Sequence, residues 1–350
     1  MQERYENLDG LRAFSAIGIV AMHVLENSSE FVISDSVFNI IASLKWLVYL
    51  FMILSGFSMC CGYYDKIIKS EIDICEFYIR RYLKILPFFS FLVIIDCVSN
   101  LNVNTIIEAI SDLTLVFGFL PNANISVIGV GWFLGVVFVF YLIFPFFIFC
   151  MRSKQSAIIT LILAVFYNIC TQFYFFDTNH VVSNFNKHTS FVFCSMFFCA
   201  GGVIYIYRET LIEFFRKRKT VCLPITIIIT ILFSLYNKNI PETLEPLGYL
   251  MLFSSWIVSA IAYDSFVFNN MIVRKVSKLS LEIYLSHMLI FRILQKLNCL
   301  YLFGNGIVAF FEIVVIVIVG TLCFCYVSIK IGKFMGKIIY ELIFCKEVLE

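Results

Sequence analysis

Residues 130–151 read VGWFLGVVFVFYLIFPFFIFCM, a stretch without a single charged side chain. About 20 mainly apolar residues are enough for a helix to cross the hydrocarbon core of a membrane. This stretch therefore predicts a transmembrane span. The periodicity of its aromatic residues, taken alone, indicates a helix that faces lipid.

The composition of the whole chain also indicates a membrane protein. Hydrophobic residues make up 61% of the 350 residues and charged residues only 14%, and mean hydropathy is +0.92. A soluble domain carries about 25% charged residues, so this chain could not cover a water-facing surface. These figures exclude a soluble globular protein, a disordered chain and a small secreted disulfide scaffold.

Ten stretches are long and apolar enough to span a membrane: 11–26, 38–62, 85–100, 130–151, 156–176, 188–207, 221–236, 246–264, 279–298 and 306–330. Residues 104–120 are also apolar but include Glu108 and Asp112, which predicts an interfacial or re-entrant segment. No internal repeat and no long polar linker divides the chain. We therefore expect an all-α integral membrane protein, a bundle of about ten transmembrane helices that forms one domain over residues 1–350.

The distribution of basic residues predicts the orientation. Lys and Arg concentrate in the cytoplasmic loops of membrane proteins. With a cytoplasmic N-terminus, only Lys45, Lys187, Lys238, Arg292 and Lys296 fall outside the cytoplasmic ends of the spans, which leaves 21 of the 26 Lys and Arg inside. We therefore expect both termini in the cytoplasm, with residues 208–219 inside and 177–187 outside.

The 13 Cys residues indicate neither a redox centre nor a metal site. Apart from the adjacent pair Cys60 and Cys61 they are scattered singly, and no C-x-x-C pair or metal-ligand spacing occurs. We interpret them as small apolar side chains and expect no metal. Because the external loops are short, any chemistry must be carried by the helices.

The first span carries the most specific polar pattern. Residues 8–12 read LDGLR, and His23 follows eleven residues after Arg12. At about 100° and 1.5 Å per residue, Arg12 and His23 project from one helix face roughly 16 Å apart, and Asp9 pairs with Arg12 at i, i+3. Ionisable side chains at membrane depth are functional candidates by default. The alternative is a buried, hydrogen-bonded His with an interfacial Arg that only fixes the topology.

The start of the third span is strongly basic. Arg80, Arg81 and Lys84 lie within two helical turns of each other at a predicted cytoplasmic end. Such a cluster suits a phosphate group, but it is also typical of a simple topology anchor. Both interpretations remain open.

Polar side chains in two other spans are further candidates. Ser280, Tyr284 and His287 share one face of the ninth span at i, i+4 and i+7, where they either contact a substrate or form interhelical hydrogen bonds. In the second span, Ser55 and Gly56 permit a close approach between helices, so packing is the first interpretation of this pair.

These motifs, in this order, resemble acyltransferase family three, the bacterial multi-span acyltransferases that O-acetylate surface polysaccharides. The strongest likeness is LDGLRA at residues 8–13, followed by the R-x10-H spacing that ends at His23. Further likenesses lie in LSGF at 54–57 and in the segments 77–87, 132–145 and 280–287. The resemblance covers nearly the whole chain.

Two positions depart from the family pattern. Lys84 stands where the family usually has the second Arg of an R-x-x-R motif, which replaces a bidentate phosphate ligand by a point charge. Val137 stands where many members have Glu, so this protein either works without that carboxylate or uses a different group.

The resemblance implies transfer of an acyl group, most often acetyl, from cytosolic acetyl-coenzyme A or another acyl-coenzyme A. The implied acceptor is a hydroxyl of a cell-surface polysaccharide or its lipid-linked precursor, and the implied location is the inner (cytoplasmic) cell membrane. The expected partners are this saccharide and membrane lipids, not nucleic acid. Because a thioester is already activated, no metal is required.

The residues are assigned to three expected roles. His23 acts as the base or as a transient acyl carrier, with Arg12 and Asp9 completing the catalytic set. The donor's phosphates are held by Arg80, Arg81 and Lys84. The acceptor side is lined by Ser55, Trp132, Ser280, Tyr284 and His287.

An alternative from another class is a transporter or flippase that moves a lipid-linked saccharide without modifying it. The intramembrane His and Arg would then form a proton-coupled substrate path. Internal repeats would favour this alternative, and the sequence shows none.

Overall fold

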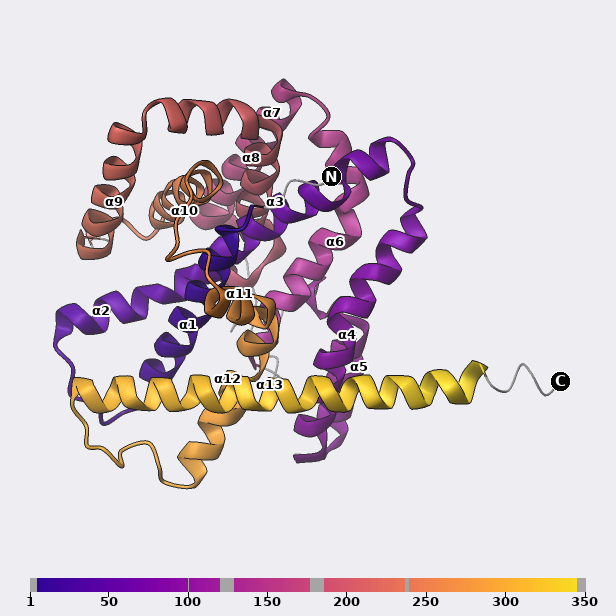
Figure 1. The fold of residues 1–350 in the computed structure, drawn as a ribbon, viewed down its shortest axis with the longest axis vertical. Helices are drawn as coiled ribbons and strands as arrows, with labels where there is room; N and C mark the ends of the chain where they lie inside the picture. Colours follow the sequence, from indigo (N-terminus) through magenta and orange to yellow (C-terminus); the bar gives the residue numbers. More distant parts are fainter. Residues whose placement is uncertain (1–4, 100, 120–128, 177–185, 237–238, 345–350) are drawn as a thin grey trace.

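The computed structural model describes residues 5–99, 101–119, 129–176, 186–236 and 239–344, with Val116 and 331–344 described by their backbone alone. All regular structure in these ranges is helical (Figure 1). The α-helices are α1 (Leu8–Glu26), α2 (Asp35–Ser43), α3 (Leu47–Ile68), α4 (Ile74–Ser99), α5 (Val103–Thr114), α6 (Trp132–Cys150), α7 (Lys154–Cys170), α8 (Phe191–Lys217), α9 (Lys219–Tyr236), α10 (Glu245–Ala262), α11 (Met271–Lys278), α12 (Ser280–Lys296) and α13 (Ile307–Phe344). The predicted all-α membrane protein is confirmed.

Nine helical stretches of the described chain are long and apolar enough to cross a membrane, against about ten predicted. They are Leu8–Glu26, Asp35–Ile68, Ile74–Ser99, Gly129–Cys150, Lys154–Phe175, Phe191–Lys217, Lys219–Tyr236, Glu245–Ala262 and Ile307–Lys330. The predicted span 279–298 corresponds to α12, whose 17 residues give a helix of about 26 Å. This is slightly less than the ~30 Å of a hydrocarbon core. Most of the predicted external loop 177–187 lies outside the described residues.

The apolar helix α6 lies inside the bundle, which corrects its interpretation as a lipid-facing helix. Phe138, Phe140 and Phe144 are each at most 1% exposed. The Phe140 ring stacks on Phe198 of α8 with centroids 4.4 Å apart. A helix that is apolar on all sides can be buried among other helices as well as face lipid, and the sequence of α6 alone does not distinguish the two.

Small residues bring α3 and α8 into close contact. A Cβ atom at Gly56 would lie 2.3 Å from the carbonyl oxygen of Phe198, and one at Gly201 would lie 2.2 Å from that of Ile53. No side chain fits at either position. The predicted packing role of the Ser55–Gly56 pair is therefore correct for Gly56. The Ser55 hydroxyl instead lies near the hydroxyl of Tyr141 on α6.

Helix α1 occupies a central position, in contact with α3, α10, α11, α12 and α13. Gly10, in the LDGLR motif, lets the loop after α10 cross this helix, because a Cβ there would lie 2.6 Å from Cα of Phe268. In Figure 1, α9 lies at the edge of the bundle beside α10, and the C-terminal part of α13 extends beyond the other helices.

Helix α5 forms the first part of the predicted interfacial segment 104–120 and is too short to span a membrane. It packs against α4 with Asp112 only 1% exposed. Burial, together with the nearby carboxylates of Glu108 and Asp96, raises the pKa of Asp112 to about 7. Helix α5 therefore places the carboxyl group of Asp112 in a buried position against the bundle.

Candidate active site

A cavity of about 620 Å³ opens between α1, α3, α4, α6 and the junction of α11 with α12. Its walls bring together six predicted site residues from four helices. They are Asp9, Arg12, Ser55, Arg81, Lys84 and Ser280. We call this space the cationic cavity.

The charge of the cavity walls explains this name. The cations are Arg12, Lys66, Arg81, Lys84 and Lys278, and the carboxylates are Asp9 and Glu282. Five cations against two carboxylates leave a formal excess of three positive charges. A concave surface with an excess of positive charge attracts anions, because the charges on its walls act together on an anion inside it.

Arg12 is held in place by Asp9 on its own helix and by Ser58 on α3. Its guanidinium lies 3.5 Å from the carboxylate of Asp9 and donates a hydrogen bond to the Ser58 hydroxyl on α3. The same Asp9 oxygen accepts a hydrogen bond of 2.9 Å from the Ser277 hydroxyl on α11. Asp9 therefore both orients Arg12 and ties α1 to α11, which supports a positioning role rather than proton transfer.

Arg81 enters the cavity from α4. It donates a hydrogen bond of 2.6 Å to the hydroxyl of Tyr63, and its guanidinium lies over the Tyr63 ring, 4.7 Å from the centroid, and near the ring of Tyr141. Its Nε is buried and has no hydrogen-bond partner among the described residues. A guanidinium held at the cavity wall by two aromatic side chains is suited to bind a phosphate oxygen.

Arg80 lies outside the cavity, so the structure does not bring it together with Arg81 and Lys84, the other two residues predicted to bind the donor. Its side chain is exposed and pairs with Glu76, one turn earlier in α4. Consecutive helix residues point about 100° apart, so Arg80 and Arg81 cannot both face the bundle. Lys84, three residues after Arg81, does reach the cavity wall.

Ser55 and Ser280 line the cavity on facing helices. The Ser55 hydroxyl lies 3.4 Å from the Tyr141 hydroxyl on α6. Trp132, predicted to lie with these residues, is not part of the wall and is half-buried at the first turn of α6 next to Phe133. Val137, which replaces the family's Glu, does line the cavity, so this wall presents a methyl surface where others carry a carboxylate.

His23 and His287 face each other across α1 and α12. Their ring centroids are 5.1 Å apart. His287 is fully buried, and its Nδ1 lies 3.2 Å from the carbonyl oxygen of Ile283. Because a carbonyl can only accept, Nδ1 carries the proton in this contact, which leaves Nε2 as an acceptor in the neutral ring. This Nε2 has no partner among the described residues.

The histidine pair lies beyond the inner wall of the cationic cavity. Phe51 and Phe133 form part of that wall, with ring centroids 6.1 Å apart. From Phe133 the ring contacts continue to Tyr284 at 5.3 Å and from Tyr284 to His287 at 6.2 Å. Arg12 and His23 therefore lie at two levels of one helix face, as predicted, separated by an aromatic layer.

Several residues of the cavity were not among the predicted site residues. They are Ser58, Tyr63, Lys66, Tyr141, Ser277, Lys278 and Glu282. Lys66 and Lys278 are two of the 21 basic residues that predict the topology. Glu282 is notable because its Oε2 is buried without a hydrogen-bond partner in the described chain. As an ionisable residue inside the predicted span 279–298, Glu282 carried a sequence signal, but it lies about 200° around the helix from Ser280 and was not among the predicted site residues.

The part of the chain that the structure describes contains no group of three or more His, Cys, Asp or Glu side chains that could hold a metal ion.

Comparison with known proteins supports the family resemblance. A family model described as an acyltransferase domain matches residues 5–330. The search of curated proteins and the search of solved structures each return no match. The matched range includes the cationic cavity and the histidine pair and supports a membrane acyltransferase rather than a transporter. The chain belongs to acyltransferase family three.

Proposed function

We propose that the protein transfers an acyl group, acetyl in the simplest case, from cytosolic acyl-coenzyme A to a hydroxyl of a saccharide. The acceptor is a cell-surface polysaccharide or its lipid-linked precursor. The observation that carries this proposal is the placement of a cationic cavity and a histidine pair along one face of α1.

The donor is the anionic partner in this scheme. Coenzyme A carries phosphate groups at one end and the thioester at the other. Arg12, Arg81 and Lys84 are suited to bind the phosphates. The distance of roughly 16 Å between Arg12 and His23 along α1 is similar to the reach of the pantetheine arm, which would pass the aromatic layer of Phe51 and Phe133.

His23 is proposed as the general base. Its imidazole accepts the proton of the acceptor hydroxyl, whose oxygen then forms a bond to the thioester carbonyl carbon. Collapse of the resulting oxyanion breaks the carbon–sulfur bond, and the coenzyme A thiolate leaves with the proton from His23. In the alternative route, the His23 imidazole attacks the thioester carbonyl and displaces the coenzyme A thiolate, which leaves with the imidazole proton. The acceptor hydroxyl then takes the acyl group from His23, and the hydroxyl proton returns to the imidazole.

His287 is proposed to support His23. With Nδ1 bound to the carbonyl oxygen of Ile283, Nε2 of His287 is an acceptor in the neutral ring, and His287 is proposed to orient the His23 ring, whose centroid is 5.1 Å away. Ser55 and Ser280, on the cavity wall, are proposed to contact the substrates, and Tyr284 lies between the two levels.

The proposed orientation places the mouth of the cationic cavity in the cytoplasm. It rests on the basic residues near the ends of the helices and on the presence of the donor in the cytosol. The proposed location is the inner (cytoplasmic) membrane with both termini inside, which requires α12 to cross the membrane in addition to the nine longer stretches.

Purified protein and labelled acetyl-coenzyme A test this proposal. We expect label to pass to an oligosaccharide extracted from the cell surface, and coenzyme A to be released in equal amount. Mass spectrometry of surface glycans from cells with and without the gene would then identify the acceptor by the added acyl mass. Binding of a saccharide without any release of coenzyme A would contradict acyl transfer.

A further inference from the structure

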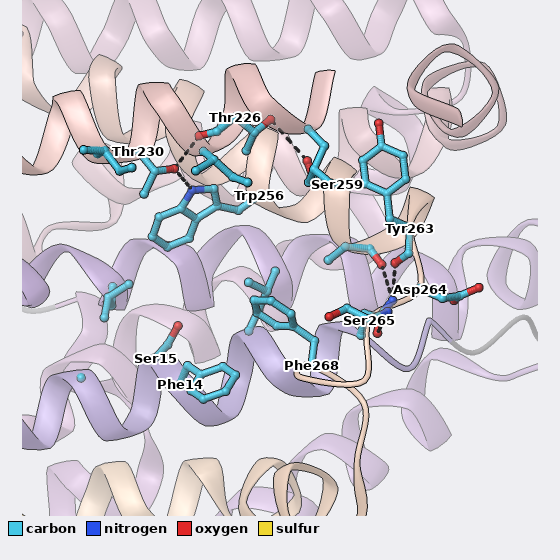
Figure 2. Close-up of a pocket in the computed structure, with 18 of the residues that line it drawn as sticks. Phe14, Ser15, Thr226, Thr230, Trp256, Ser259, Tyr263, Asp264, Ser265 and Phe268 are labelled. Carbon is cyan, nitrogen blue, oxygen red and sulfur yellow. Dashed lines mark hydrogen bonds between the residues drawn. The ribbon is translucent and has the colours of Figure 1, made fainter. Parts of the chain in front are cut away.

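A second cavity, of about 650 Å³, lies on the other side of α1 (Figure 2). It is bounded by α1, the start of α3, α9, α10 and the loop after α10. Leu11, Phe14, Ser15 and Gly18 form its α1 wall. At 100° per residue, this stripe points roughly 140° away from the face of Asp9, Arg12 and His23. Helix α1 therefore separates this second cavity from the proposed reaction centre.

The inner part of the second cavity suits a hydrocarbon chain. Among the residues of α9, only Thr226 is buried, and its hydroxyl lies 3.4 Å from that of Ser259 on α10. One turn further, Trp256 of α10 donates a hydrogen bond of 2.8 Å from Nε1 to Thr230 (Figure 2). These bonds join α9 to α10 and satisfy the polar groups. An apolar chain beside them therefore leaves none of these donors without a hydrogen-bond partner.

One end of the second cavity is polar and carries both signs of charge. Lys219 begins α9, and Asp264 lies in the loop after α10; both line this end. Within the described ranges neither forms an ion pair, and the Lys219 ammonium lies 5.7 Å from the ring of Tyr263. A ligand head with one negative and one positive group matches this end, whereas a purely anionic head would meet the Asp264 carboxylate.

The loop beside this polar end has the character of a membrane surface. Phe266 and Val267 are 83% and 59% exposed. Apolar side chains that protrude next to charged ones are favourable where the headgroups of a bilayer meet its hydrocarbon. The polar end thus lies at headgroup level, and the apolar part extends from there between the helices toward the membrane interior.

We propose that the second cavity binds one zwitterionic phospholipid of the bilayer. Its phosphate lies at Lys219, its ammonium group at Asp264, and a hydrocarbon chain fills the space between α1, α9 and α10. Because α1 separates this lipid from His23, it is a bound structural lipid and not the acyl acceptor. This inference does not depend on the proposed acyl transfer.

Native mass spectrometry of the delipidated full-length protein tests the headgroup assignment. The probes are phosphatidylethanolamine, phosphatidylglycerol and diacylglycerol with identical chains. We expect phosphatidylethanolamine to be retained best. Lys219→Gln and Asp264→Asn should each weaken its retention about tenfold, the weight of one charge-assisted hydrogen bond.

Two control variants accompany these. Lys217→Gln removes a neighbouring cation that pairs with Glu213 and lies outside the second cavity, and Glu209→Gln removes an exposed carboxylate. Both should retain the lipid as the native protein does. Equal retention of phosphatidylethanolamine by all variants, or a preference of the native protein for phosphatidylglycerol, would overturn the assignment. Displacement by a polyprenyl phosphate at lower concentration would assign the site to a lipid-linked acceptor instead.

The fluorescence of Trp256 tests where the chain lies. Phosphatidylethanolamine with a brominated chain should quench the part of the emission that Trp256→Phe removes, and the unbrominated lipid should relieve this quenching. Lys219→Gln should shift the quenching curve to about tenfold higher lipid, in proportion to the lost contact. Quenching that is absent, or the same in Lys219→Gln, would show that the chain does not enter the second cavity through this headgroup site.

Discussion

Arg80 and Arg81 are consecutive residues of α4 with opposite expected roles. Arg81 lines the cationic cavity and has a buried Nε without a partner in the described chain, whereas Arg80 is exposed and paired with Glu76. Substituting each by Gln removes the same charge from the same helix turn. The pair therefore separates donor binding from a general effect of basic residues on topology.

The expected size of the effect follows from the contacts of Arg81. A hydrogen bond to a charged group is worth about 1.5–3 kcal/mol, which corresponds to a factor of roughly 10 to 150 in an equilibrium constant. The cavity opens to water, so we expect the lower end. Arg81→Gln should raise the donor KM about tenfold, and Arg80→Gln should leave it unchanged.

Initial rates of coenzyme A release from acetyl-coenzyme A, with the acceptor saturating, provide the assay. Both variants must first show native insertion and a monodisperse peak. Lys84→Arg, which restores the paired arginines of the family, should bind the donor at least as tightly as the native protein. A tenfold rise in KM for Arg80→Gln, or an unchanged KM for Arg81→Gln, would refute the assignment of the cavity as the donor site.

Four further predictions test the geometry. Inserting one Ala within residues 13–22 should abolish transfer, because it rotates His23 by about 100° relative to Arg12; near-native transfer by a folded variant would argue against the shared face. A single Cys at Gly304, between α12 and α13, should be labelled from outside the cell and one at Glu209 only from inside; the reverse pattern would invert the topology. Gly201→Ala should destabilise the protein by about 1–3 kcal/mol through overlap with Ile53, whereas Gly62→Ala, which meets no atom within 4 Å, should not; equal melting temperatures would refute the α3–α8 contact. Burial and the nearby Lys187 lower the pKa of His188 to about 4. The unfolded chain therefore binds more protons than the folded protein between pH 4 and 6.5, and the free energy of unfolding should rise with pH across this window by up to about 3 kcal/mol. The same pH dependence of the free energy of unfolding in His188→Gln would contradict this.

The sequence was sufficient for the spans and for the polar face of α1, because both depend on periods along a single helix. The prediction that Asp9, Arg12 and His23 share one helix face required no information about other helices. The cavity itself could not be predicted in this way, since its walls come from six helices. Lys278 and Glu282 belong to it only because the α11–α12 junction packs against α1.

The predicted site residues that lie outside the cationic cavity have a common physical explanation. Arg80 and Trp132 were chosen by motif, but the direction of a side chain depends on which helix face meets the bundle. The sequence of α6 likewise does not show whether its apolar faces meet lipid or other helices, so its burial in the bundle was not predicted. The second cavity had no sequence signal, because Thr226, Trp256 and Ser15 lie on three different helices and each alone is a common residue of a membrane span.

The central claim is that His23 carries out acyl transfer from a donor held in the cationic cavity. The most direct measurement compares the native protein with His23→Ala, using labelled acetyl-coenzyme A for both donor binding and transfer to the saccharide. We expect native donor affinity and no transfer in His23→Ala, because Arg12, Arg81 and Lys84 remain in place. Transfer at the native rate by a correctly folded His23→Ala protein would contradict the account.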